Sequence, residues 1–141
     1  METLIEDNNY NCIKTQADAV LYFLQNLDID MIDLLLPANR TYQDFDKHIF
    51  IQKLGEALEE FKSDGDTFLN QFSGHCNSQI CNFNCAGFAY VGNHSGNYFY
   101  LIVDIKDGEV MDMYECSNFK TADFVKFVGK NIKIDKLDLL F

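Results

Sequence analysis

The fold is decided by the stretch Asn84-Cys-Ala-Gly-Phe-Ala-Tyr-Val-Gly-Asn-His-Ser-Gly-Asn-Tyr-Phe-Tyr-Leu-Ile-Val-Asp-Ile-Lys-Asp-Gly-Glu-Val-Met-Asp-Met-Tyr-Glu-Cys116. It predicts three strands in a meander, at residues 85–91, 98–105 and 109–116, because each run is rich in β-branched and aromatic residues. Residues 92–97 and 106–108 join the strands, and both joints contain the Gly or Asn that a tight turn needs at positions of positive φ. The middle strand has apolar side chains on both faces, which is typical of a strand buried on both sides.

The residues before the meander predict helices. Thr15, with Asp18 three residues later, is a helix N-cap signal, and Asp28 is a second one before a short helix that must end by Pro37. Apolar residues recur at helical spacing in both segments: Val20, Leu21, Phe23, Leu24 and Leu27 in the first, and Ile29, Ile32, Leu35 and Leu36 in the second.

Residues 40–45 favour β-structure and predict one short strand. Asp46 is then placed to cap a longer helix, which Gly65 ends. The buried stripe of this helix is expected to consist of Phe50, Leu54, Ala57, Leu58 and Phe61. Alternation from Thr67 to Phe72 indicates the start of a sheet. After the meander, we expect a helical turn within residues 123–128 and a last strand near residues 131–135.

The composition argues against several classes of partner. The 141 residues carry 22 Asp and Glu against 11 Lys and Arg, a net charge of −11. This charge disfavours binding to nucleic acid or to an acidic membrane surface, because both need positive side chains. No run approaches the ~20 apolar residues of a membrane span. Five cysteines cannot all pair with one another, and the first residues lack a secretory signal, so the sequence predicts a cytoplasmic protein with reduced thiols.

The order of the elements predicts the α+β class. Helices come first and antiparallel strands follow, so the N-terminal helices are expected to pack on a curved antiparallel sheet. Residues 1–14 are expected to form a loose arm and residues 15–141 a single domain. A long amphipathic helix over a curved sheet would leave an apolar pocket between them. We expect the pocket to be lined by Tyr42, Phe50, Leu54, Phe88 and Tyr90.

A family resemblance is carried by four features in this order: Leu27-Asp-Ile-Asp-Met-Ile-Asp-Leu-Leu-Leu36, then Thr41-Tyr-Gln-Asp44, then the helix that contains Phe50, and then the meander. Over roughly residues 15–118 this layout resembles the nuclear transport factor 2-like superfamily, the cone-shaped, cystatin-like α+β roll that also includes ketosteroid-isomerase-like enzymes. The superfamily contains isomerases, dehydratases and binding modules. The resemblance therefore leaves enzymatic activity open. We expect the aromatic-lined pocket to bind a small apolar or partly polar molecule, and we expect no cofactor.

Two aspartates and two tyrosines of the meander are candidates for catalysis. A carboxylate in an apolar pocket has a raised pKa and can act as a general base, while a phenol can donate a hydrogen bond to a developing oxyanion. The candidates are Asp104 and Asp112 as carboxylates and Tyr100 and Tyr114 as donors. An enzyme of the isomerase or dehydratase type would use one such pair. The alternative, favoured by the general exposure of Asp, is that both aspartates face water near strand ends.

His75, Cys76, Cys81 and Cys85 raise the alternative of a metal site. Zinc ligands usually come in pairs two to four residues apart, and only Cys81 and Cys85 approach that spacing. Small buried thiols that fill a core are the favoured interpretation, so no metal is predicted.

A third hypothesis is a non-catalytic module that forms a homodimer through one face of its sheet. Strict alternation would place Tyr98, Tyr100, Ile102, Met111 and Met113 on the outer face of the sheet. The same alternation would place Val110, Asp112 and Tyr114 on the opposite face of the last strand. An exposed apolar surface of this kind is typical of a protein–protein interface.

Overall fold

Two capped helices open the part of the chain that the structure describes. The structure, a computed structural model, describes residues 13–76, 86–116, 119–121 and 126–134. The hydroxyl of Thr15 accepts a hydrogen bond from the N–H of Asp18 at the start of α2 (Gln16–Gln25). The carboxylate of Asp28 does the same for the N–H of Met31 at the start of α3 (Ile29–Leu35). Both predicted caps are confirmed, and each satisfies an N–H group that the first helical turn leaves without a backbone partner.

Residues 41–46 form a β-hairpin, so the predicted single strand is wrong. β1 (Thr41–Tyr42) pairs antiparallel with β2 (Phe45–Asp46), and the turn residues Gln43 and Asp44 have φ angles of 52° and 64°. Positive φ at both central residues defines a type I′ turn, which usually carries Asn-Gly. Gln-Asp gives no such signal in the sequence.

The long helix α4 (Lys47–Ser63) buries the predicted stripe: Phe50, Leu54, Ala57, Leu58 and Phe61. Gly65 follows the helix with a φ of 96°, which confirms its predicted role at the end of the helix. Asp46 occupies the N-cap position, but its side chain makes no capping hydrogen bond. The expected side-chain cap is therefore wrong. The backbone of Asp46 is already paired with Thr41 in the hairpin.

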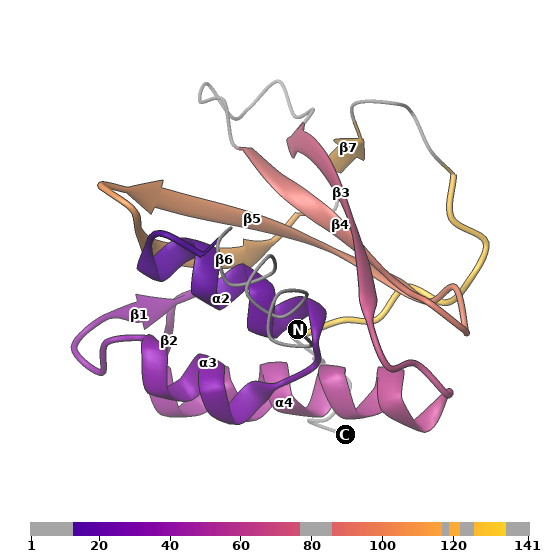
Figure 1. Ribbon diagram of the computed structural model, residues 1–141, viewed down its shortest axis with the longest axis horizontal. Coiled ribbons are helices and arrows are strands. Elements are labelled where there is room, and N and C mark those ends of the chain that lie inside the picture. Colours follow the sequence, from indigo (N-terminus) through magenta and orange to yellow (C-terminus); the bar gives the residue numbers. More distant parts are fainter. Residues whose placement is uncertain (1–12, 77–85, 117–118, 122–125, 135–141) are drawn as a thin grey trace, which may run out of the picture.

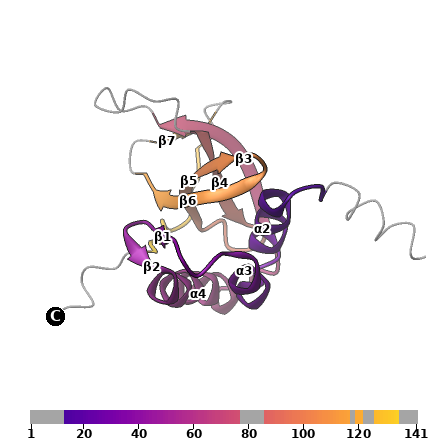
Figure 2. The same ribbon diagram turned by 90° about the vertical axis from the view of Figure 1, so that its left-hand side faces the viewer.

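The predicted meander is confirmed and forms the centre of a five-stranded antiparallel sheet. Its strands are β4 (Ala86–Gly92), β5 (Tyr98–Lys106) and β6 (Glu109–Glu115), and β3 (Leu69–Cys76) and β7 (Phe119–Thr121) complete the order β6-β5-β4-β3-β7. Every pairing in the sheet is antiparallel. Figures 1 and 2 show α2, α3 and α4 gathered on one side of this sheet, which is the predicted α+β arrangement.

A β-bulge interrupts the alternation of side chains in β6. Val103 pairs with Met113 and Asp104 with Asp112, but Ile105 pairs with Val110, so Met111 is the additional residue. Met113 and Val110 therefore both lie in the core between the sheet and the helices. The predicted separation of these two residues onto opposite faces is wrong, because strict alternation fails at a bulge.

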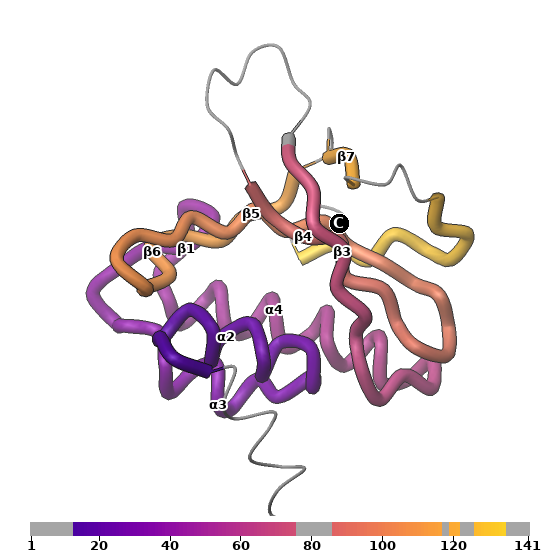
Figure 3. The backbone as a smooth tube through the Cα atoms, turned by 45° about the horizontal axis from the view of Figure 1, so that its top comes forward, coloured from indigo at the N-terminus to yellow at the C-terminus, as the bar shows by residue number. Residues whose placement is uncertain are grey.

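The segment after β7 returns to the start of β5. We call residues 126–134 the C-terminal segment, and Figure 3 shows it in yellow beside the sheet. The N–H of Tyr98 donates to the carbonyl of Lys130, and the N–H of Ile132 donates to the carbonyl of Tyr98. Within the described residues, the predicted last strand is reduced to one parallel bridge between Tyr98 and Asn131. No helical turn is formed by residues 126–128, and the rest of that predicted turn lies outside the described ranges.

Candidate functional site

A pocket of about 380 Å³ lies where the β1–β2 hairpin meets β6. Gln43 and Asp44 line it from the turn, and Asp112, Tyr114 and Glu115 line it from the strand. β6 is the edge strand of the sheet, so that side chains from both of its faces can reach the hairpin. The lining offers three carboxylates, an amide and a phenol.

Gln43 holds the two walls of the pocket together. Its backbone N–H donates to Oδ1 of Asp112 at 3.0 Å. Its side-chain amide pairs twice with Glu115: Nε2 donates to Oε1 at 3.3 Å, and Oε1 accepts from the backbone N–H of Glu115 at 3.1 Å. These three hydrogen bonds join residues that are about 70 positions apart in the sequence, and they fix the turn against the strand.

The pocket contains strained backbone. An L-residue in the left-handed region costs on the order of 1 kcal/mol, and both Gln43 and Asp44 are in that region. The hydrogen bonds to Asp112 and Glu115 offset this cost. Backbone strain that is maintained by such specific contacts occurs most often at binding and catalytic sites.

Asp112 is a carboxylate of the pocket whose pKa is raised. Burial raises the pKa of its carboxyl group, the neighbouring Asp44 and Asp104 raise it further, and the hydrogen bonds from the N–H groups of Gln43 and Met113 lower it in part. The net direction is upward from the ordinary value of 3.8. A carboxylate of this kind is easier to protonate than one in water, and it is a better base.

The substitution Asp112→Asn is expected to stabilise the protein at neutral pH. A raised folded-state pKa means that the folded protein binds this proton more tightly than the unfolded chain does. Stability is then lost as the pH rises from 3.8 through the folded-state pKa. An Asn side chain keeps the Oδ1 acceptor and removes the charge. We expect a gain below about 1 kcal/mol at pH 7, since solvent screens a half-exposed group.

This gain should shrink as the pH falls below the ordinary Asp range, because the wild-type carboxyl group is then protonated too. Urea unfolding of the wild type and of Asp112→Asn from about pH 3 to pH 8 measures the difference in free energy of unfolding. A variant that is less stable than the wild type at pH 7 would contradict the argument.

The structure brings together only part of the predicted catalytic set. Asp112 and Tyr114 line the same pocket. Asp104 is exposed and lies opposite Asp112 on the neighbouring strand β5. Its charge contributes to the raised pKa of Asp112. Tyr100 lies on β5 and stacks on Phe119 with ring centroids 5.2 Å apart.

The residues predicted to line an aromatic pocket lie against one another in the interior. Tyr42, Phe50, Leu54 and Tyr90 are fully buried members of one continuous cluster, and the half-buried Phe88 packs on it. The rings of Tyr42 and Phe50 are 5.5 Å apart, and those of Phe88 and Tyr90 are 5.8 Å apart. Burial raises the pKa of the Tyr90 phenol well above its usual range, and its hydroxyl donates to Gln71.

Sequence signals for the rest of the pocket are weak. Neither Gln43 nor Glu115 belongs to a motif, so the sequence predicts no role for them. The polar pair Gln43-Asp44 between the β-favouring Tyr42 and Phe45 is a local sign of the hairpin. The pairing of Gln43 with β6 has no counterpart in any local pattern.

The metal hypothesis is a prediction that the structure does not test. His75 is exposed at the end of β3, whereas Cys81, Cys85 and the side chain of Cys76 lie outside what the structure describes. Among the described residues, no group of three or more His, Cys, Asp or Glu side chains is arranged to hold a metal ion.

The outer face of the sheet is partly covered by the chain itself. Phe127 of the C-terminal segment packs on Tyr98 and Tyr100, with ring centroids 5.4 Å and 6.4 Å away. Ile102 is buried next to Phe119, and Met113 is buried on the helix side. The homodimer remains a prediction, with a smaller apolar surface than the sequence suggested.

No helix in the described parts of the chain is both long and apolar enough to cross a membrane.

Comparison with protein families, with curated proteins and with solved structures finds no match to this chain. The fold is α+β, with helices packed on an antiparallel sheet.

Proposed function

We propose that the protein binds a small molecule that donates hydrogen bonds, in the pocket between the β1–β2 hairpin and β6. The observation that carries this proposal is the lining itself. Asp44, Asp112 and Glu115 supply carboxylate acceptors around a volume of about 380 Å³, beside the ring of Tyr114. This volume is in the range of small-ligand sites, which are roughly 300–1,000 Å³.

The charge of the site selects the class of ligand. Ionised carboxylates are acceptors only, so they favour an ammonium, amidinium or guanidinium group over a neutral or anionic one. Tyr114 can contact the apolar part of such a molecule or attract its cation through the face of the ring. The overall charge of −11 attracts the same ligands over a longer range.

Binding can be tested with benzamidine, using benzamide and benzoate as neutral and anionic ligands of nearly the same shape. Titration followed by NMR of the backbone amides is expected to show benzamidine shifting Gln43, Asp44 and Tyr114. The double substitution Asp44→Asn and Asp112→Asn should weaken binding about tenfold or more, because each charge-assisted contact contributes on the order of 1 kcal/mol. Glu56→Gln, at an exposed position of α4, is the matched control and should leave binding unchanged. Equal binding of benzoate, or no effect of the double substitution, would contradict the proposal.

The second candidate function is proton transfer of the isomerase or dehydratase type. Two observations favour it: Asp112 and Tyr114 line one pocket, and the pKa of Asp112 is raised. In this reaction Asp112 would remove a proton beside a carbonyl group, and Tyr114 would donate a hydrogen bond to the oxyanion that forms.

This activity can be tested with cyclic β,γ-unsaturated ketones, whose isomerisation to the conjugated ketone increases ultraviolet absorbance. Turnover should be lost in Asp112→Asn and reduced about a hundredfold or more in Tyr114→Phe. If the wild type turns over none of these ketones while benzamidine still binds, the enzymatic proposal is contradicted and the binding proposal stands.

A further inference from the structure

We propose that the pocket and the C-terminal segment are coupled through Glu115, so that a change in the β1–β2 hairpin controls how firmly Ile134 is held. This inference concerns the regulation of the pocket and rests on the proposed function. Its physical basis is one side chain that contacts both regions. Oε1 of Glu115 accepts from Nε2 of Gln43, and Oε2 accepts from the backbone N–H of Ile134 at 2.6 Å.

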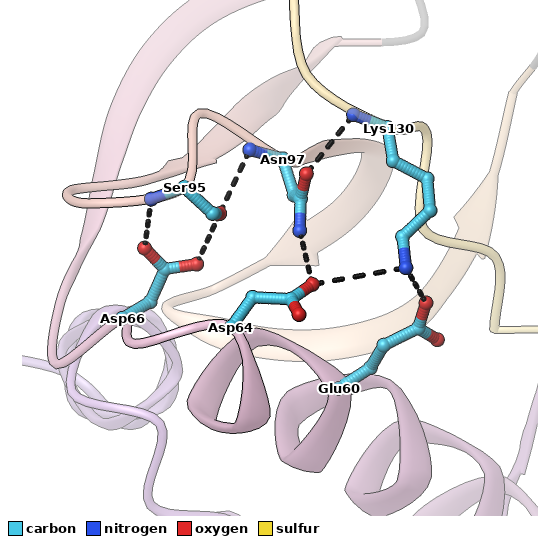
Figure 4. A network of polar contacts seen from close by, with 6 residues as sticks. All are labelled: Glu60, Asp64, Asp66, Ser95, Asn97 and Lys130. Carbon is cyan, nitrogen blue, oxygen red and sulfur yellow. Dashed lines mark hydrogen bonds and ion pairs between the residues drawn. The ribbon is translucent and has the colours of Figure 1, made fainter.

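The middle of the C-terminal segment is fixed by a separate polar network, in which Lys130 contacts Glu60, Asp64 and Asn97 (Figure 4). Nζ of Lys130 lies 2.7 Å from Glu60 and 3.7 Å from Asp64, and its backbone N–H donates to Oδ1 of Asn97. Asn97 in turn donates to Asp64 at 2.6 Å. The hydrogen bond to Glu60 raises the pKa of Lys130, so the middle of the segment keeps its positive charge over the physiological range.

Two residues after Lys130, the segment is held by a backbone hydrogen bond. The N–H of Ile132 donates to the carbonyl of Tyr98 at 2.7 Å, and both Ile132 and Ile134 are buried in the core. Neither the Lys130 network nor the Ile132 bond involves a residue of the pocket. Among the residues that the structure describes, the hydrogen bond from Ile134 to Glu115 therefore joins this segment to the pocket.

The orientation of the Glu115 carboxylate depends on its contacts with Gln43 and with Ile134. When the hairpin and β6 are in contact, Gln43 holds Oε1 and directs Oε2 toward Ile134. When the hairpin moves or a ligand draws Glu115 into the pocket, the N–H of Ile134 loses an acceptor that carries a full negative charge. Local opening of the segment at Ile134 then becomes easier, while Ile132 and Lys130 stay in place. By linkage, a ligand that stabilises the hairpin against β6 must also protect Ile134.

The test is amide hydrogen exchange of Ile134, measured by NMR without ligand. In Glu115→Gln one amide oxygen must serve two donors, the side chain of Gln43 and the N–H of Ile134. We expect exchange at Ile134 to be about tenfold faster or more. In Gln43→Glu two carboxylates face each other, so exchange at Ile134 should also increase. Exchange at Ile132 should change little in both variants.

The double variant that carries Gln43→Glu and Glu115→Gln exchanges the two side chains. The carboxylate at position 43 can then accept from the amide at position 115, whose oxygen is left for Ile134. Exchange at Ile134 should return to within about threefold of the wild type, since the side-chain amide at position 115 and the N–H of Ile134 both have acceptors again. Glu109→Gln, on the same strand and 3.6 Å from Arg40, is the matched control and should not affect Ile134.

Unchanged exchange at Ile134 in Glu115→Gln would overturn the proposal. The same holds for a double variant that is no better protected than the single variants, and for parallel increases at Ile132 and Ile134. Because these measurements contain no ligand, the coupling can be overturned while benzamidine binds, and benzamidine binding can fail while the coupling is found.

Discussion

Replacing Phe99 by alanine is expected to lower the free energy of unfolding by about 3–5 kcal/mol, the range for fully buried aromatic rings. Phe99 has no exposed surface, and its ring lies 5.7 Å from Phe61 of α4 and 5.5 Å from Tyr90 of β4. It therefore joins the helix layer to the sheet. Truncation removes the transfer free energy of the ring and leaves a cavity that its neighbours can only partly fill. Urea denaturation measures the loss.

Phe127→Ala is the matched control for this substitution. Phe127 is a half-buried ring on the outer face of the sheet, where it packs on Phe72, Tyr98 and Tyr100. Its truncation is expected to cost below about 2 kcal/mol, since solvent can occupy the space. If Phe99→Ala lowered the free energy of unfolding no more than Phe127→Ala does, the interior would be loosely filled. A cavity between the helices and the sheet would have this effect.

Replacing Gly92 by alanine is the second large effect, a loss of about 3 kcal/mol. A Cβ atom at this position would lie 2.0 Å from Oδ2 of Asp66. That carboxylate is almost completely buried and accepts three hydrogen bonds: from the N–H of His94, the N–H of Ser95 and the hydroxyl of Ser95. Moving it away would leave three partly buried donors without this acceptor. Part of this network is visible in Figure 4.

Gly55→Ala provides a glycine control with the opposite sign. Gly55 lies inside α4, and an added Cβ would be 3.4 Å from a side-chain atom of Ile29, a contact that the flexible end of Ile29 can accommodate. Alanine is favoured over glycine inside a helix by roughly 0.5–1 kcal/mol, so this variant should be more stable than the wild type. Thermal unfolding of the two alanine variants side by side measures both effects. A Gly92→Ala protein within 0.5 kcal/mol of the wild type, on the order of the effect of an ordinary surface substitution, would show that Asp66 can move freely.

The sequence by itself determined the elements whose causes are local. Thr15 and Asp28 cap their helices through bonds that span three residues, and the stripe from Phe50 to Phe61 follows from helical spacing. The turn at residues 106–108 follows from Asp107 and Gly108, both of which have positive φ as an Asp-Gly type I′ turn requires. For these elements the chain carries the necessary information within one or two turns of backbone.

Only the tertiary structure decided the pocket. The turn at Gln43 and Asp44 has a conformation that neither residue prefers, and it exists because Asp112 and Glu115 accept its hydrogen bonds from about 70 residues away. The bulge at Met111 and the pairing of β7 with β3 likewise depend on the neighbouring strand. Asp112 and Tyr114 could be chosen from the sequence as polar residues in an apolar strand. Their partners could not, because the free energy that selects those contacts arises only when distant segments pack together.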